Sequence, residues 1–144
     1  MAKTYRFKDR FEASRERIQE ILVDPRCRED EATQVARAIE AKCDVTEPGP
    51  GLKRLTVRQK EYGRGLDGKK DTSKIEDVTL VVDWDCAAFE GRWKWSMASQ
   101  ADRVRVEGST RIVADGNACS VLEEGRVDVK VPMLGSMIEG KVVS

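Results

Sequence analysis

The stretch that decides the fold is Gly125-Arg126-Val127-Asp128-Val129-Lys130-Val131-Pro132, followed by Met133-Leu134-Gly135-Ser136-Met137-Ile138-Glu139. In an extended chain alternate side chains point to opposite faces, so the three valines share one face and the charged residues share the other. Pro132 has no backbone N–H for a sheet ladder and therefore ends the predicted strand. Ser136 is a suitable N-cap for a helix that follows. This pattern predicts a curved sheet with a C-terminal helix laid across it.

The rest of the chain also reads as strands and helices. Residues 4–12 alternate as a first strand, and the next apolar patterns predict two helices, over residues 15–23 and 29–42. Ser14 is the expected cap of the first helix, and Asp24-Pro25 is expected to end it. Further strands are predicted over residues 43–47, 52–62, 74–85, 89–99, 103–114 and 118–131, with a polar loop over residues 63–73. This order predicts an α+β fold with a mostly antiparallel sheet, in one domain spanning residues 1–144.

The composition argues against several kinds of partner. Charged residues make up 36% of the 144 residues, but 26 Lys and Arg balance 26 Asp and Glu, so the formal net charge is zero. This balance gives no electrostatic basis for binding nucleic acid or an anionic membrane surface. No apolar run approaches the length of a membrane span. We therefore expect the charged side chains to form the wet outer face of the sheet.

The cysteines indicate reduced thiols. Cys27, Cys43, Cys86 and Cys119 form no Cys-x-x-Cys pair, and the sequence contains no histidine. Because these spacings match no common zinc pattern, neither a metal nor a cofactor is predicted. The N-terminus has no apolar signal region, so we expect a cytoplasmic protein whose cysteines are free.

A row of large side chains on one predicted strand is the most informative feature for function. Trp93, Trp95 and Met97 alternate with polar residues in this strand. Such a row either fills a core or lines an apolar cavity. Met adapts to irregular shapes, which favours a cavity, but the sequence leaves both interpretations open.

Two carboxylates lie among apolar side chains. Asp9 shares a strand face with aromatic residues, and Glu123 shares one with valines. A carboxylate that faces a cavity could act as an acid or a base, although such groups more often lie near a strand end or pair with arginine. Because the chain offers no histidine base and no nucleophile triad, we assign no catalytic residue.

Two motifs carry a resemblance to known proteins. The first is Tyr5-Arg6-Phe7-x-x-x-Phe11-x-Ala13-Ser14 with the later Leu22-Val23-Asp24-Pro25, which resembles the entry strand and first helix of the START-related helix-grip (SRPBCC) superfamily of polyketide cyclases and lipid-transfer proteins. The second is Gly125-x-Val127-x-Val129-x-Val131-Pro132-x-Leu134-Gly135-x-x-Ile138-Glu139, supported by Gly91 and Gly108. It is similar to the bacterial START-like domain-of-unknown-function 2505 family. The resemblance implies a curved antiparallel sheet, two short helices after the first strand and a C-terminal helix.

The resemblance also implies a function. We expect a non-enzymatic protein that binds a hydrophobic small molecule, lipid-like or polyketide-like, in a cavity between the sheet and the C-terminal helix. Residues 137–144 span only about 12 Å as a helix, so either the lid is short and leaves the cavity partly open, or the chain was cut within this helix. The candidates for the cavity lining are Phe7, Trp84, Trp93, Trp95, Met97, Val127, Val129, Met133, Met137 and Ile138.

Two other functions fit the same sequence. One is an enzyme of the cyclase or hydrolase type that uses Asp9 or Glu123. The other is a protein-interaction module, which docks on a partner or forms a homodimer through an apolar C-terminal patch at Met133, Met137 and Ile138. A cavity favours ligand binding, a carboxylate inside that cavity favours the enzyme, and an exposed apolar patch favours the interaction module.

Overall fold

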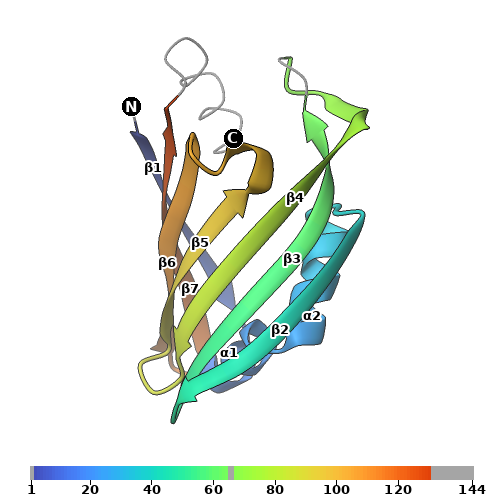
Figure 1. Cartoon of the computed structure of the whole chain (residues 1–144). Helices are drawn as coiled ribbons and strands as arrows, with labels where there is room; N and C mark the ends of the chain where they lie inside the picture. The colour runs from blue at the N-terminus through green and yellow to red at the C-terminus, as the bar shows by residue number, and fades with distance from the viewer. Residues whose placement is uncertain (1, 65–66, 131–144) are drawn as a thin grey trace.

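The structure, a computed structural model, describes residues 2–64 and 67–130. In this part of the chain two helices follow the first strand and six further strands follow the helices (Figure 1). The fold is therefore α+β, as the sequence predicts. The strands are β1 Ala2–Phe11, β2 Glu40–Gly49, β3 Leu52–Arg64, β4 Lys70–Asp85, β5 Glu90–Met97, β6 Val104–Asp115 and β7 Ala118–Val129.

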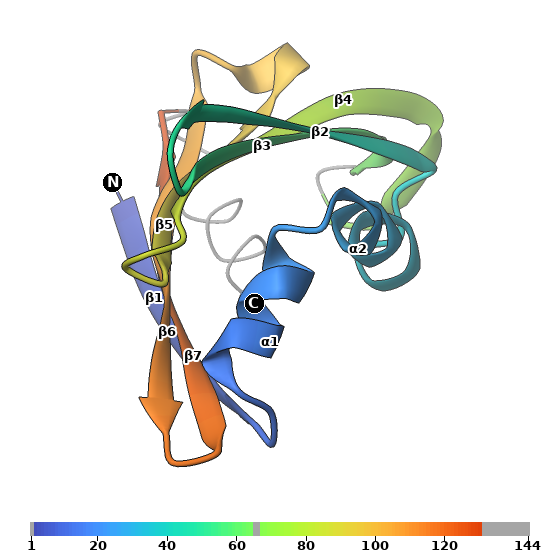
Figure 2. The same cartoon turned by 90° about the horizontal axis from the view of Figure 1, so that it is seen from below.

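The seven strands form one antiparallel sheet in the order β1-β7-β6-β5-β4-β3-β2. The first strand pairs with the last, so that Tyr5 lies opposite Gly125 and Phe7 lies opposite Glu123. The sheet bends strongly: β1, β7, β6 and β5 form one wall, and β4, β3 and β2 form the other (Figure 2). Both helices lie on the concave side, between these walls.

The first predicted helix is confirmed. Helix α1 spans Arg15–Leu22, and the Ser14 hydroxyl caps it by accepting a hydrogen bond from the Arg17 N–H at 3.2 Å. On the sheet side, the Trp84 indole N–H donates to the Gln19 side-chain oxygen at 2.8 Å. This hydrogen bond ties α1 to the concave face near the end of β4.

The second predicted helix, over residues 29–42, is wrong at both ends. Helix α2 spans Pro25–Asp30 and continues into a π-helical turn, η1, over Glu31–Val35. The Asp24 carboxylate accepts from the Arg26 N–H at 2.8 Å, and proline occupies the first turn, where its missing N–H costs nothing. Asp24-Pro25 therefore begins a helix instead of only ending one.

The last part of that predicted helix is strand. Arg37 turns the chain with a positive φ of 62°. The Ile39 N–H then donates to the Lys60 carbonyl at 2.7 Å, and β2 begins at Glu40. Val35, the last residue of η1, is 76% exposed, so this turn buries no apolar face there. Pairing along the edge of the sheet outweighs the weak helical pattern.

Another prediction is corrected, and one lies beyond the described part of the chain. The predicted polar loop over residues 63–73 is largely strand, because Gly63 pairs with Asp71 and Arg64 pairs with Lys70. The hairpin between β3 and β4 is therefore longer than its polar composition indicates. The predicted C-terminal helix, with its Ser136 N-cap, lies outside the described residues.

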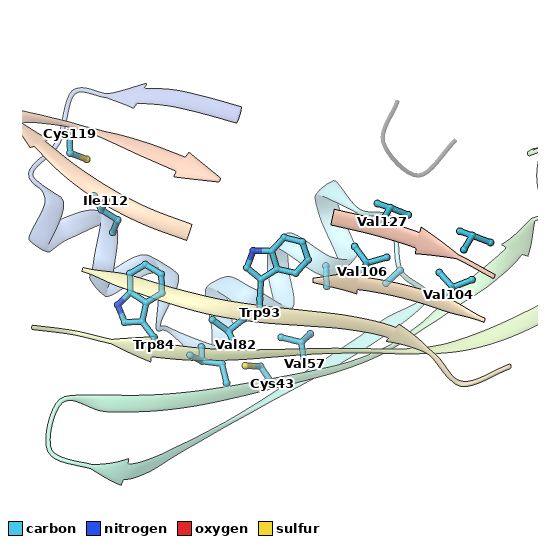
Figure 3. Close-up of a cluster of buried hydrophobic side chains, with 14 residues drawn as sticks. Cys43, Val57, Val82, Trp84, Trp93, Val104, Val106, Ile112, Cys119 and Val127 are labelled. Atoms are coloured by element: carbon cyan, nitrogen blue, oxygen red, sulfur yellow. The ribbon is translucent and has the colours of Figure 1, made fainter. Parts of the chain in front are cut away.

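The hydrophobic core lies between the concave face and the helices (Figure 3). Leu55 and Val127 are 0% exposed, and Trp84 is 1% exposed. The outer face carries exposed charges, including the ion pair of Arg54 with Asp83 at 2.7 Å. The alternation of apolar and charged residues along the strands thus becomes a dry concave side and a wet convex side.

Candidate functional site

A cavity of about 220 Å³ lies on the concave side of the sheet. Five strands and the helical segment α2–η1 contribute to its lining. Five of the lining side chains are apolar, and the others are polar or charged. The lining residues are Tyr5, Arg28, Glu31, Leu80, Val82, Trp93, Trp95, Val106, Thr110 and Glu123.

The apolar wall is formed by paired residues of β4, β5 and β6. Leu80 lies opposite Trp95, and Val82 lies opposite Trp93. On the other side of β5, Val106 lies opposite Trp95. Trp93 is 8% exposed and projects from β5 on the concave side (Figure 3), whereas Trp95 is only partly buried. The two indoles give the cavity an aromatic wall.

The polar wall is centred on Glu123. The Thr110 hydroxyl, on the neighbouring strand, lies 3.5 Å from Glu123 Oε1. Burial raises the pKa of the Glu123 carboxyl above its ordinary value of 4.5, and the charge of Glu31 raises it further. Asp9 adds a smaller increase, whereas Thr110 and Arg28 oppose these effects. Asp9, the other candidate carboxylate, is itself exposed and does not line the cavity.

Two glycines make room for the aromatic rings at this wall. Gly108 and Gly125 lie directly opposite each other on β6 and β7. A Cβ atom at Gly125 would overlap the Tyr5 ring, and one at Gly108 would lie 2.6 Å from Trp93 Cζ2. Burial, and then the charge of Glu123, raise the pKa of Tyr5 to about 12, so its hydroxyl stays protonated at neutral pH.

The helical side of the cavity supplies two charged residues. Arg28 comes from α2, and Glu31 begins η1. The Arg28 Nε donates to the Leu22 carbonyl at 2.7 Å, which fixes the guanidinium against the end of α1. The lining therefore contains two carboxylates, Glu31 and Glu123, and one cationic side chain, Arg28.

The indole nitrogen of Trp93 has no hydrogen-bond partner among the described residues, although it is buried. The other buried indole, Trp84, is satisfied by Gln19. An unpaired buried donor costs roughly 1–3 kcal/mol. This N–H therefore lies in the packed part of the Trp93 side chain and not at the surface of the cavity.

Of the ten sequence-predicted lining residues, the structure places two in the cavity wall: Trp93 and Trp95. It places three others in the packed core, with exposures of 1% for Trp84, 0% for Val127 and 3% for Val129. These three share the concave face with the cavity but are covered by neighbouring side chains. Trp84 in particular packs under α1, away from the cavity lining.

The remaining five candidates lie elsewhere. Phe7 is 53% exposed, with its ring 5.2 Å from that of Tyr5. Met97 is partly buried opposite Val78 and does not line the cavity. The other candidates lie outside the described residues: Met133, Met137 and Ile138.

Several lining residues were missed by the sequence analysis. Leu80, Val82 and Val106 lie on strand faces that the alternation identifies as inward, so the sequence carried a signal for them. Arg28 and Glu31 had no such signal, because the segment containing them was assigned the wrong helix bounds. Their position depends on how α2 crosses the concave face.

A larger hollow of about 490 Å³ lies mainly on the outer face. Most of its lining residues are charged and alternate with the residues of the concave face. The lining residues are Asp83, Asp85, Glu90, Gly91, Arg92, Ser109, Thr110, Arg111, Leu122 and Glu124. This surface lacks an apolar wall, so the smaller concave cavity is the better candidate for a ligand site.

Residues 2–64 and 67–130 contain neither a metal-ligand cluster nor a membrane-spanning helix. In these residues no three His, Cys, Asp or Glu side chains are grouped so that they could hold a metal ion. In the same ranges, every helix is too short or too polar to cross a bilayer.

Solved structures with similar folds include two bacterial proteins and a plant enzyme. The Zhui aromatase/cyclase from Streptomyces sp. R1128 matches with a TM-score of 0.64 at 14% identity, over 99% of this chain and 86% of that chain. A protein from Thermus thermophilus matches with a TM-score of 0.68 at 16% identity, over 98% of this chain and 84% of that one. Norcoclaurine synthase from Thalictrum flavum, solved with dopamine and hydroxybenzaldehyde, gives 0.63 at 13% identity, over 97% and 76%.

The TM-scores show a shared helix-grip fold, in which a curved sheet encloses helices. No curated protein matches the sequence. The family match is more specific than the structural neighbours, because it is a match of the sequence itself over nearly the whole chain. Over residues 6–144 the sequence matches the model described as "Protein of unknown function (DUF2505)", and the chain belongs to that family.

Proposed function

We propose that this protein binds a small hydrophobic ring compound in the concave cavity. The observation that carries the proposal is the cavity itself: about 220 Å³, with Trp93 and Trp95 in one wall. Displacing poorly bound water from this wall would drive uptake of an apolar molecule. The polar wall around Glu123 would orient it, as a few placed polar groups do in most ligand sites.

The size of the cavity favours a ring compound over a long-chain lipid. A cavity of about 150 Å³ holds benzene, whereas drug-sized ligands need roughly 300–1,000 Å³. The observed volume of about 220 Å³ lies between these values, so the cavity can hold a single ring or a pair of fused rings. Of the two ligand classes expected from the sequence, the polyketide-like class therefore fits better than the lipid-like one.

A second candidate function is an enzyme that transfers protons. It is favoured by the raised pKa of Glu123, because an acid or base works best when its pKa lies near the working pH. Two of the structural neighbours are named as enzymes, an aromatase/cyclase and a synthase. Conversion of a bound ring compound by the wild type, lost in Glu123→Gln while binding remains, would favour this candidate. Recovery of the compound unchanged would favour a binding protein.

Two valines on one strand allow a matched test of ligand binding. Val104 and Val106 both lie on the concave face of β6, and each is 5% exposed, but only Val106 lines the cavity. Val106→Met would extend into the cavity and reduce its volume. Val104→Met would instead press into packed neighbours, at a cost of about 1–3 kcal/mol.

Equilibrium dialysis with naphthalene measures the outcome. We expect the wild type and Val104→Met to bind naphthalene and Val106→Met to bind it much more weakly. Thermal unfolding of both variants provides the stability control, and Val106→Met should lose less stability than Val104→Met. Equal naphthalene binding by all three proteins would place the ligand outside this cavity.

A further inference from the structure

Glu123 has hydrogen-bonding capacity that the described residues do not fill. It makes no ion pair within 4.0 Å in this part of the chain, and its partner Thr110 lies at 3.5 Å. That distance exceeds the usual O–H···O range of about 2.5–3.0 Å. A carboxylate can accept about four hydrogen bonds, and Glu123 is only partly buried, so part of this capacity is open to a ligand or to water. Glu123 is therefore an acceptor short of donors, and it faces the cavity.

Trp93 and Trp95 form the apolar side of the same cavity. The Trp93 Nε1 is fully buried and has no acceptor among the described residues, so it lies in the packed part of the wall and not at the cavity surface. Glu123 therefore remains the acceptor that a ligand in this cavity can reach.

The charge of the lining restricts which polar groups a ligand can carry. Glu31 and Glu123 face the cavity against the single cation Arg28, which already donates to the Leu22 carbonyl. A ligand carboxylate would add a third negative charge to this wall. A hydroxyl group adds no charge, and it both donates and accepts.

We propose that the ligand is an uncharged hydroxylated aromatic compound, of the phenol or naphthol type, whose hydroxyl group donates a hydrogen bond to Glu123. The aromatic rings lie against the wall of Trp93 and Trp95. This assignment rests on the proposed function, because it requires the concave cavity to be the ligand site. It names the chemical group that the cavity selects.

Three probes of the same ring system test the assignment: naphthalene, 2-naphthol and 2-naphthoate. Their dissociation constants are measured by equilibrium dialysis at neutral pH. A hydrogen bond to a carboxylate lowers the dissociation constant of a ligand by a factor of about ten or more. 2-Naphthol should therefore bind about ten times more tightly than naphthalene, or tighter still. 2-Naphthoate should bind more weakly than 2-naphthol, because two carboxylates face it.

Matched variants connect the preference to one residue. Glu123→Met removes the acceptor while keeping a long side chain, so it should bind naphthalene and 2-naphthol equally. Glu123→Gln keeps an acceptor oxygen and should retain a preference for 2-naphthol. Glu124→Met is the control, because Glu124 is exposed on the opposite face of β7, where it pairs with Arg6 at 3.3 Å. It should leave the wild-type preference unchanged.

The outcomes separate this inference from the proposed function. If the wild type binds naphthalene and 2-naphthol equally, the hydroxyl anchor is refuted and the cavity remains a ligand site. If 2-naphthoate binds most tightly, Arg28 is the anchor and the inference is also refuted. If none of the three probes binds, both the proposed function and this inference fail.

Discussion

Trp84 and Trp95 lie on the same concave face but have different surroundings, and their replacement should separate core from cavity wall. Trp84 is 1% exposed, and its indole N–H donates to Gln19 at 2.8 Å. Trp95 is partly exposed and lines the cavity. The perturbation is Trp84→Ala compared with Trp95→Ala.

The expected magnitudes follow from these surroundings. Removing a fully buried aromatic side chain costs about 3–5 kcal/mol of unfolding free energy, and we expect this range for Trp84→Ala. Trp95→Ala should cost less than about 3 kcal/mol, because a side chain next to a void has fewer neighbouring atoms to lose. Gln19→Ala should cost about 1–3 kcal/mol, because it leaves the Trp84 N–H buried and unpaired.

Urea unfolding followed by far-ultraviolet circular dichroism measures these differences without relying on tryptophan emission. The total stability of a domain is about 5–15 kcal/mol, so Trp84→Ala leaves a small margin. If it does not fold, Trp84→Phe and Trp95→Phe replace the alanine pair. A cost for Trp95 equal to or greater than that for Trp84 would refute the cavity wall. Unchanged stability in Gln19→Ala would refute the anchoring of α1 by Trp84.

Other predictions concern the polar wall and the thiols. Gly125→Ala should reduce the free energy of unfolding by about 1–3 kcal/mol, because the added methyl group overlaps the Tyr5 ring. The measurement is the melting temperature, which should fall. An unchanged melting temperature would contradict this packing. Burial raises the pKa of Glu123 in the folded state, so its ionisation opposes folding. Wild-type stability relative to Glu123→Gln should therefore be greatest below the unfolded pKa of 4.5 and should fall as the pH rises through the folded pKa. Melting temperatures of the two proteins across this pH range test the sign, and wild-type stability that rises relative to Glu123→Gln with increasing pH would contradict it. Titration with a thiol reagent, after denaturation without reductant, should count four free cysteines. In the folded protein Cys43 and Cys119 should react slowly, because both are buried. A count of two or fewer in the denatured protein would mean that disulfides form.

The strands could be predicted from the sequence because their side chains alternate. Val104, Val106 and Ile112 mark the inner face of β6 in the sequence, and all three are buried in the structure. The segment from Pro25 to Glu40 could not be predicted in the same way. Its helical pattern is weak, and pairing between β2 and β3 decides where the helix ends.

The candidate site was only partly visible in the sequence. Trp84 and Trp93 both belong to inward-facing rows, so alternation could not tell them apart. The difference arises from α1, which covers Trp84 through Gln19 and does not fill the cavity beside Trp93. Glu123 was recognised as a carboxylate among apolar neighbours, but its place in the cavity depends on the pairing of β7 with β6.

The indole N–H signals of the three tryptophans test the central claim most directly. A two-dimensional ¹H–¹⁵N NMR spectrum of the labelled protein, assigned with single Trp→Phe variants, resolves Trp84, Trp93 and Trp95 separately. On addition of 2-naphthol we expect the Trp93 and Trp95 signals to shift in a saturable manner, and the Trp84 signal, held by Gln19, to stay in place. Unchanged Trp93 and Trp95 signals at saturating 2-naphthol, or a shift confined to Trp84, would contradict the account.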